Sequence, residues 1–205
     1  TVLVTAPAPV PPLVGGWLAG TPTQSDAALV AFLTDSTYIL APDGTPEPPT
    51  DTNPGQPGVE VGRFTWANNG TLSGVFSPTV TTSTIGGFGF GTIAGTATLR
   101  ISANGDTLVY QDALDTVPVN KVHPSLTNAL VGTWVFSDPI NPARILVIMF
   151  ADDSNYFLGI VDPPGGSGGP GMERGSYTWN STTGAISVTA TKDTNGTRAL
   201  SPLFS

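Results

Sequence analysis

The chain has 205 residues and no cysteine, and 7 basic against 15 acidic side chains give it a formal net charge of -8. Disulfides and thiol chemistry are therefore excluded, and nucleic acid is not an expected partner because no basic patch is present to neutralise phosphates. With 25 glycines, 20 prolines and abundant threonine and serine, the composition favours an all-β fold of short strands joined by turns.

Residues 1–12, TVLVTAPAPVPP, form a leader in which five β-favouring residues precede a proline-rich stretch. Each proline fixes φ and removes a backbone donor, so we expect this stretch to stay extended. One interpretation is a disordered leader or a linker. The other is a donor strand that pairs with another chain, formed by Val2, Leu3, Val4, Thr5 and Val10.

A first domain is predicted over residues 13–123. Apolar runs and turn residues predict its strands. In the strand over 59–66, alternation places Glu60, Phe64 and Trp66 on one face. The predicted strands cover 13–19, 28–34, 36–41, 59–66, 71–77, 93–102, 107–111 and 116–122.

After a linker at 124–129, a second domain over 130–205 repeats the first, beginning with Leu-Val-Gly-Thr-Trp at 130–134 where the first has Leu-Val-Gly-Gly-Trp at 13–17. Repeats of this kind share a fold. The first copy spans 117 residues to position 129 and the second spans 76. We therefore expect two tandem antiparallel β-barrel or sandwich domains, the second lacking the last strands. The other matches are Phe32, Asp35, Ser36 and Tyr38 with Phe150, Asp153, Ser154 and Tyr156, and Glu60, Gly62, Phe64, Thr65 and Trp66 with Glu173, Gly175, Tyr177, Thr178 and Trp179.

A Gly-x-Trp motif on a first strand, at Gly15-Gly16-Trp17 and again at Gly132-Thr133-Trp134, resembles the calycin superfamily of lipocalin-like β-barrels. The resemblance implies an up-and-down series of strands around a small cavity, with Arg100 as a candidate for the basic residue that covers the tryptophan. The motifs EVGRFTW and ERGSYTW are similar to repeated domains of secreted bacterial proteins.

Catalytic and metal-binding groups are few, and we expect no enzyme activity, metal or cofactor. His123 is the only histidine and lies at a linker position. Asp152-Asp153 and Asp193-Thr194-Asn195-Gly196 carry oxygen ligands that calcium prefers, but turn chemistry explains both. Glu60 and Glu173 share a face with aromatic residues, where a carboxylate needs a salt bridge or a hydrogen bond; a general acid is the alternative.

Ten aromatic residues are predicted to fill the core or to line a ligand cavity. For the four tryptophans a sugar-stacking platform is a second interpretation. A cavity in the first repeat would be lined by Trp17, Phe32, Tyr38 and Phe64 and would take a small apolar ligand. The remaining members of the set are Trp66, Trp134, Phe150, Tyr156, Tyr177 and Trp179.

Two functions follow as expectations. In the first, the chain is the structural subunit of an extracellular bacterial filament or surface array, in which the leader of one copy is inserted into the open sheet of the next. In the second, it is a secreted calycin-like protein that binds a small apolar ligand. The composition suggests an exported protein, no apolar run reaches the roughly 18 residues of a spanning helix, and the sequons at Asn69, Asn180 and Asn195 could carry glycans.

Overall fold

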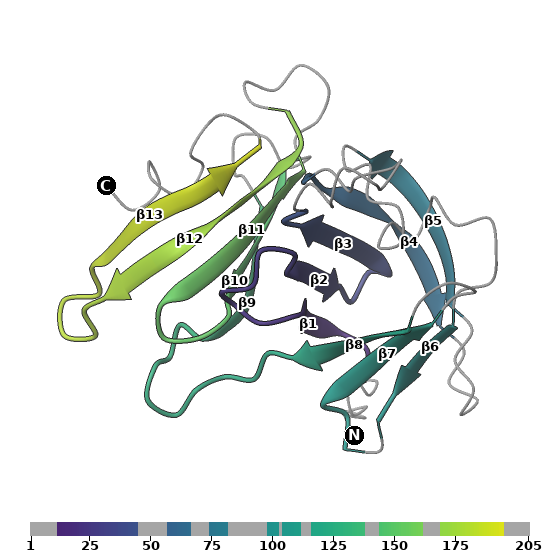
Figure 1. The fold of residues 1–205 in the computed structure, drawn as a ribbon, viewed down its shortest axis with the longest axis horizontal. Helices are drawn as coiled ribbons and strands as arrows, with labels where there is room; N and C mark the ends of the chain where they lie inside the picture. The colour runs from purple at the N-terminus through teal and green to yellow at the C-terminus, as the bar shows by residue number, and fades with distance from the viewer. Residues whose placement is uncertain are drawn as a thin grey trace, which may run out of the picture.

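The computed structural model describes residues 12–44, 57–66, 74–81, 98–102, 104–111, 116–137, 144–161 and 169–194. Across these ranges the chain forms strands and no helix, and the strands make two antiparallel sheets (Figure 1). This confirms the all-β fold with one sheet for each repeat. Neither sheet is closed into a barrel by the described strands.

The first sheet contains eight strands in the order β5-β4-β3-β2-β1-β8-β7-β6. Consecutive strands are neighbours except β5 and β6, which lie at opposite ends of this order, and β8 returns to pair with β1, placing Lys121 opposite Trp17. The bounds are β1 Gly15–Ala19, β2 Ala28–Phe32, β3 Thr37–Pro42, β4 Glu60–Trp66, β5 Gly74–Thr81, β6 Thr98–Ile101, β7 Thr107–Gln111 and β8 Thr116–Lys121.

The second sheet contains five strands in the order β13-β12-β11-β10-β9, which reproduces the order of β5 to β1. The described residues of this repeat contain no counterparts of β6, β7 and β8, as the shorter second copy predicts. The bounds are β9 Gly132–Ser137, β10 Ile145–Phe150, β11 Asn155–Val161, β12 Gly171–Trp179 and β13 Ile186–Asp193.

The match between the repeats extends to an irregularity in the sheets. The register of β5 on β4 shifts between Val61 and Gly62, and that of β13 on β12 shifts between Arg174 and Gly175. Each shift skips one residue of the edge strand, as in a β-bulge. A side chain at Gly175 would meet the carbonyl oxygen of Thr189 at 2.0 Å, so the bulge brings the neighbouring backbone too close for a Cβ atom. This explains the glycine in the repeated Glu-x-Gly sequence.

Each sheet has a core on the face turned away from the other repeat. In the first repeat, Trp17, Phe32, Tyr38 and Phe64 are buried together with smaller apolar side chains from β1 to β4, β7 and β8. The second repeat has a similar core, where Phe150 and Tyr156 pack with Tyr177. One edge-to-face aromatic pair recurs: the ring centroids of Phe32 and Phe64 are 5.2 Å apart, and those of Phe150 and Tyr177 are 4.7 Å apart.

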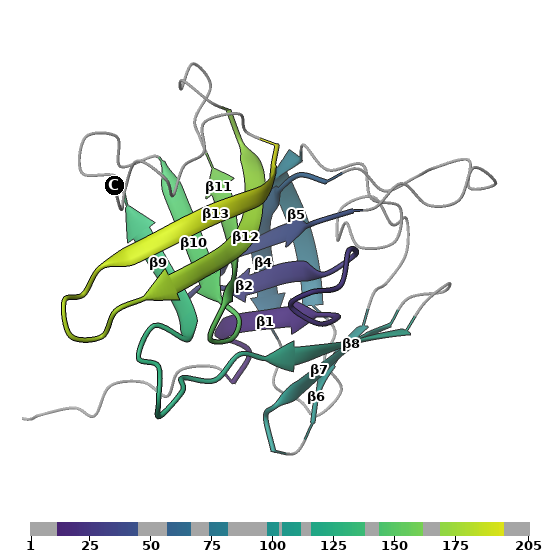
Figure 2. The same ribbon diagram turned by 60° about the vertical axis from the view of Figure 1, so that its left-hand side comes forward.

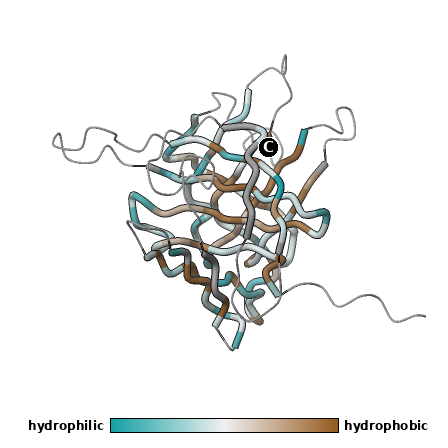
Figure 3. Tube along the Cα trace, turned by 90° about the vertical axis from the view of Figure 1, so that its right-hand side faces the viewer, coloured by the Kyte–Doolittle hydropathy of each residue, from teal (hydrophilic) through white to brown (hydrophobic). Residues whose placement is uncertain are grey.

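A third core joins the two sheets back to back. It contains side chains from β1 to β4 on one side and from β10, β11 and β12 on the other. Figure 2 shows the two sheets as separate layers, and Figure 3 shows hydrophobic segments inside the layered structure. The members are Leu18, Ala27, Leu29, Ala31, Ile39, Ala41, Val59, Val61, Val147, Met149, Phe157 and Met172.

Equivalent positions of the two repeats meet across this core. Ala41 and Gly159 are 118 residues apart, as are the matched hairpins, and a Cβ atom at Gly159 would lie 3.4 Å from that of Ala41. Likewise Gly16 faces its own counterpart, Thr133, whose Cβ atom would lie 2.6 Å from a Cβ atom at Gly16. The repeats therefore contact through the same face in an approximately two-fold arrangement.

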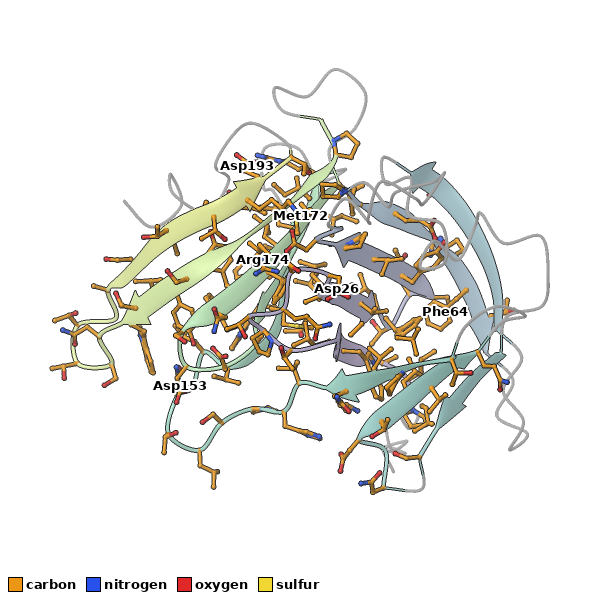
Figure 4. The ribbon with its side chains drawn as sticks, viewed as in Figure 1. Asp26, Phe64, Asp153, Met172, Arg174 and Asp193 are labelled. Carbon is orange, nitrogen blue, oxygen red and sulfur yellow. The ribbon has the colours of Figure 1, made fainter. Side chains whose placement is uncertain are left out.

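A buried ion-pair cluster borders the shared core. Asp43 follows β3, and its side chain is 5% exposed. Arg174 of β12 forms an ion pair with one carboxylate oxygen, and Lys192 Nζ of β13 lies 2.6 Å from the other. Arg174 also donates to the carbonyl oxygen of Gln24 at 2.7 Å. Figure 4 shows Arg174 and Met172 on β12, beside the strands of the first repeat.

Candidate functional site

The most distinctive surface of the molecule is the outer edge of β9. In the first repeat, β1 is hydrogen-bonded on both sides, to β2 and β8. Its counterpart β9 pairs with β10, and among the described residues no strand pairs with the other edge. An open edge offers unpaired backbone donors and acceptors, so it can template the addition of a further strand.

The first-strand tryptophans show what the additional strand does. Trp17 and Trp134 each donate a hydrogen bond of 2.8 Å from Nε1 to a carbonyl oxygen four residues earlier, so the two indoles are held in the same way. Trp17 is nevertheless 0% exposed, whereas Trp134 is 43% exposed. On β8, Lys121 Nζ lies 5.2 Å from the centroid of the Trp17 ring. Trp134 is therefore far more exposed than its counterpart, and among the described residues no strand lies beside β9 as β8 lies beside β1.

Two further apolar side chains extend this surface along β9. Val135 is 49% exposed and Phe136 is 45% exposed. Trp134 and Phe136 lie on one face of the strand and Val135 on the other. We call these three residues the β9 patch. Exposed apolar side chains along an open edge make an association site or an aggregation hazard.

The opposite edge of the same sheet is different in character. Strand β13 alternates between half-buried and exposed positions, and the exposed ones along its middle are Ser187, Thr189 and Thr191. Hydroxyl side chains of this kind are well solvated and gain little from being covered. The distribution of apolar surface therefore points to β9 as the edge at which another strand docks.

The two glutamates predicted to need a partner receive one from a tyrosine of the adjacent strand. Tyr38 donates a hydrogen bond of 2.7 Å to Glu60 Oε1, and Tyr156 donates one of 2.6 Å to Glu173 Oε1. Burial raises the pKa of both tyrosines well above the ordinary value, and the adjacent glutamate raises it further. The phenols thus stay neutral and act as hydrogen-bond donors, which makes each pair a link between strands.

Tyr177 makes a third buried phenol contact in the second repeat. Its hydroxyl donates to the carbonyl oxygen of Asp152 at 2.6 Å and accepts from Asn128 Nδ2 at 3.0 Å. Burial raises its pKa, while the Asn128 hydrogen bond acts in the opposite direction. The contacts tie the segment before β9 to the β10–β11 turn.

The aromatic set predicted from the sequence divides into four groups. Seven members are buried in the two outer cores: Trp17, Phe32, Tyr38, Phe64, Phe150, Tyr156 and Tyr177. Trp179 is partly buried against the second of these cores, and Trp134 belongs to the β9 patch. The side chain of Trp66 lies outside what the structure describes. A ligand cavity between Trp17, Phe32, Tyr38 and Phe64 stays a prediction.

The leader residues Val2, Leu3, Val4, Thr5 and Val10 lie outside the described residues. So do the sequons at Asn69 and Asn195. Asn180 is exposed, but its Oδ1 accepts hydrogen bonds from the backbone N–H groups of Thr182 and Thr183, at 3.0 Å and 3.1 Å. Glycan attachment stays a prediction.

The polar candidates lie in turns and at the surface. His123 Nε2 is 2.8 Å from Asp106 Oδ1 in a half-exposed pair. Asp152 Oδ1 accepts from the backbone N–H groups of Ser154 and Asn155, at 2.8 Å and 2.7 Å, as turn chemistry predicts. In the described ranges, no three His, Cys, Asp or Glu side chains are grouped as a metal site would require, and no helix suits a membrane crossing.

Sequence reasoning did not single out Val135, Phe136 or Lys121. A usable signal was present, because Val135 and Phe136 occupy the positions of Leu18 and Ala19, which pair with β8. Comparing each second-repeat residue with the environment of its first-repeat counterpart would have found them.

Comparisons with protein-family models, with curated proteins and with solved structures found no match to this chain.

Proposed function

We propose that this chain is the structural subunit of an extracellular filament or surface array, assembled head to tail by addition of a β-strand to β9. The β9 patch carries the proposal. The first repeat buries Trp17 beneath β8, while the second repeat presents the equivalent tryptophan on an open edge. A structural role also suits the aromatic set, of which seven members fill cores.

The energetics favour a strand as the occupant of this edge. Trp134, Val135 and Phe136 are each close to half exposed. Full burial of such a side chain contributes about 1.5–3 kcal/mol, so covering the remaining half of all three contributes roughly 2–4 kcal/mol. An added strand also makes main-chain hydrogen bonds of about 1 kcal/mol each. A small apolar ligand would cover the side chains and leave the backbone edge open.

The occupant we propose is the leader, residues 1–12, of another copy. It belongs to neither repeat, and its Thr-Val-Leu-Val start has the β-branched residues that strands favour. Donor and acceptor surfaces on one chain are then different, so each contact joins unlike ends of two copies. A contact of this type does not close on itself unless the rotation happens to form a ring, and it generates a polymer.

Deletion of residues 1–10 tests the proposal. We expect the full chain to form polymers visible by electron microscopy and to elute early in size-exclusion chromatography, and the deleted chain to elute as a monomer. Phe136→Lys should have the same effect from the acceptor side, because it places a charge where the donor strand would pack. Thr189→Lys on β13 is the matched control and should still polymerise. Intact polymers after the deletion would refute the proposal.

A further inference from the structure

We infer that the leader docks on β9 in the register that β8 adopts on β1, placing Val4 opposite Phe136, Thr5 opposite Val135 and Ala6 opposite Trp134. This inference rests on the proposed function and adds to it the strand direction, the residue pairs and the face that the donor buries.

The first support is a likeness between the leader and β8. Residues 1–5 read Thr-Val-Leu-Val-Thr, and residues 116–120 of β8 read Thr-Val-Pro-Val-Asn. Thr1, Val2 and Val4 are thus identical to Thr116, Val117 and Val119. Among the described residues, the second repeat has no counterpart of β8 beside β9. The leader resembles β8 in sequence, so it resembles the strand that would fill this place.

The second support is the place of each segment along the chain. Thr116 lies 14 residues before Leu130, which opens the second repeat, and Thr1 lies 12 residues before Leu13, which opens the first. Strand β8 precedes the second repeat but does not pair with its first strand, β9; it pairs with β1, the first strand of the first repeat. By the same relation the leader should pair with the first strand of a repeat other than the one it precedes. Of the two strands that open a repeat, β1 and β9, only β9 has a free edge within the described residues.

The third support is the pattern of burial on β8. Val119 is 4% exposed in the first core, and Val117 packs against that core, while the intervening Pro118 is exposed. On the leader these positions are Val4, Val2 and Leu3. In the β8 register both valines therefore face the core of the second repeat, on the side where Trp134 and Phe136 project.

The transfer of register is direct. On the first sheet, Trp17 pairs with Lys121, Leu18 with Asn120 and Ala19 with Val119. Trp134, Val135 and Phe136 occupy the positions of those β1 residues, and Ala6, Thr5 and Val4 occupy those of the β8 residues. Of these three β8 residues, only Lys121 has no chemically similar counterpart in the leader, which has Ala6 at that position.

Cysteine cross-linking tests the register, because the chain has no cysteine and every thiol is then an introduced one. In Thr5→Cys/Val135→Cys the two Cβ atoms should be close enough for a disulfide. The matched control is Leu3→Cys/Val135→Cys, in which the donor thiol is on the same face but about 7 Å further along the strand, beyond the reach of a disulfide. Both variants are oxidised mildly and run on a non-reducing gel, and reduced samples of both are examined by electron microscopy.

We expect a ladder of cross-linked oligomers from Thr5→Cys/Val135→Cys and a single monomer band from the control. A ladder from the control alone, or polymers without cross-links in either variant, would overturn the register and leave strand donation standing. A disulfide within one chain would show donation in cis and overturn the pairing between copies. Absence of polymers from both reduced variants and from the unsubstituted chain would overturn the proposed function itself.

Discussion

The buried tyrosine–glutamate pairs show how one residue contact is preserved across two repeats. Tyr38 and Tyr156 are 118 residues apart, their partners Glu60 and Glu173 are 113 apart, and both pairs lie on adjacent strands in an outer core. A buried carboxylate is costly without hydrogen bonds. The tyrosine hydroxyl supplies one of them from within the sheet, and it holds β3 to β4 and β11 to β12 by side chains as well as by backbone.

Tyr156→Phe removes the hydrogen bond to Glu173, and we expect a loss of about 1–3 kcal/mol in the free energy of unfolding at neutral pH. The substitution should also change the response to alkali. The folded pKa of Tyr156 is raised above the value of 10.0 expected in the unfolded chain. Its stabilising effect is therefore complete below pH 10 and is lost as pH rises above it, with a slope of up to about 1.4 kcal/mol per pH unit.

Urea unfolding of the native chain and of Tyr156→Phe between about pH 9 and about pH 11 measures this slope. The variant should lose stability less steeply with rising pH, and Tyr38→Phe should behave alike because its pKa is raised by the same causes. Equal slopes in the native chain and both variants would contradict the prediction.

At the scale of single residues, the sequence allowed the important residues to be predicted but not the tyrosine–glutamate contacts between them. Repetition identified Glu60, Glu173 and both tyrosines, and alternation placed the glutamates among aromatic residues. It could not show that a tyrosine is the donor, because the pairing depends on the register of β3 on β4. Trp134 illustrates the limit: its sequence context matches that of Trp17, and the difference in exposure arises from a strand outside the motif.

Among the elements, β1 and β9 approach each other closely where the two repeats meet. A Cβ atom at Gly16 would lie 1.7 Å from Thr133 Oγ1 and 2.6 Å from Thr133 Cβ. The second of these distances cannot be relieved by rotating the threonine side chain. Strand β1 therefore needs a glycine at the position where β9 has a threonine, although the two positions are equivalent in the repeat.

Gly16→Ala should lower the free energy of unfolding by about 1–3 kcal/mol, since it forces the two strands apart. Adding Thr133→Gly removes the obstructing side chain, so the double variant should be more stable than Gly16→Ala alone. Chemical denaturation of the native chain, both single variants and the double variant completes the cycle. Failure of Thr133→Gly to recover any stability would contradict this account of the β1–β9 contact.

The elements themselves could be predicted with little error. Strands expected over 107–111, 116–122 and 59–66 correspond to β7 at Thr107–Gln111, β8 at Thr116–Lys121 and β4 at Glu60–Trp66. Apolar runs and turn residues act locally, which is why they define strands well. The bulges opposite Gly62 and Gly175 could not be predicted from these signals, because a bulge depends on the neighbouring strand.

For the whole molecule, the main correction to the sequence picture is that the two repeats share a core. A tandem repeat predicts two units of like fold and gives no information on how they pack. The shared core explains why strands β2 and β10 are fully apolar: one face of each lies in an outer core and the other in the shared core. The barrel alternative assumed that each sheet closes on itself, whereas the described strands leave both sheets open.

The ion-pair cluster at Asp43 should couple the two repeats. Asp43→Asn leaves Arg174 and Lys192 without the carboxylate that neutralises them in a mostly buried place, and we expect a loss of about 3 kcal/mol in the free energy of unfolding. Asp35→Asn is the control. Asp35 pairs with Arg63 at 3.6 Å, and their side chains are 60% and 62% exposed, respectively. That substitution should cost less than about 1 kcal/mol.

Calorimetry or urea unfolding of the two variants measures the difference. In Asp43→Asn the transition should also broaden, because the two sheets are less strongly coupled and can unfold with less cooperativity. Similar losses in both variants would show that the Asp43 cluster is no more important than an exposed ion pair.

The β9 patch occurs once in each chain, and this has a consequence for growth. If the leader of one copy fills the β9 edge of the next, a polymer of any length retains one vacant edge at one tip and one unused leader at the other. The two tips are then chemically distinct, and the polymer has a polarity. A short synthetic peptide with the sequence of residues 1–10 would act as a chain terminator at the tip with the vacant edge. Elongation at the opposite tip would continue only with chains whose own β9 edge had not bound the peptide.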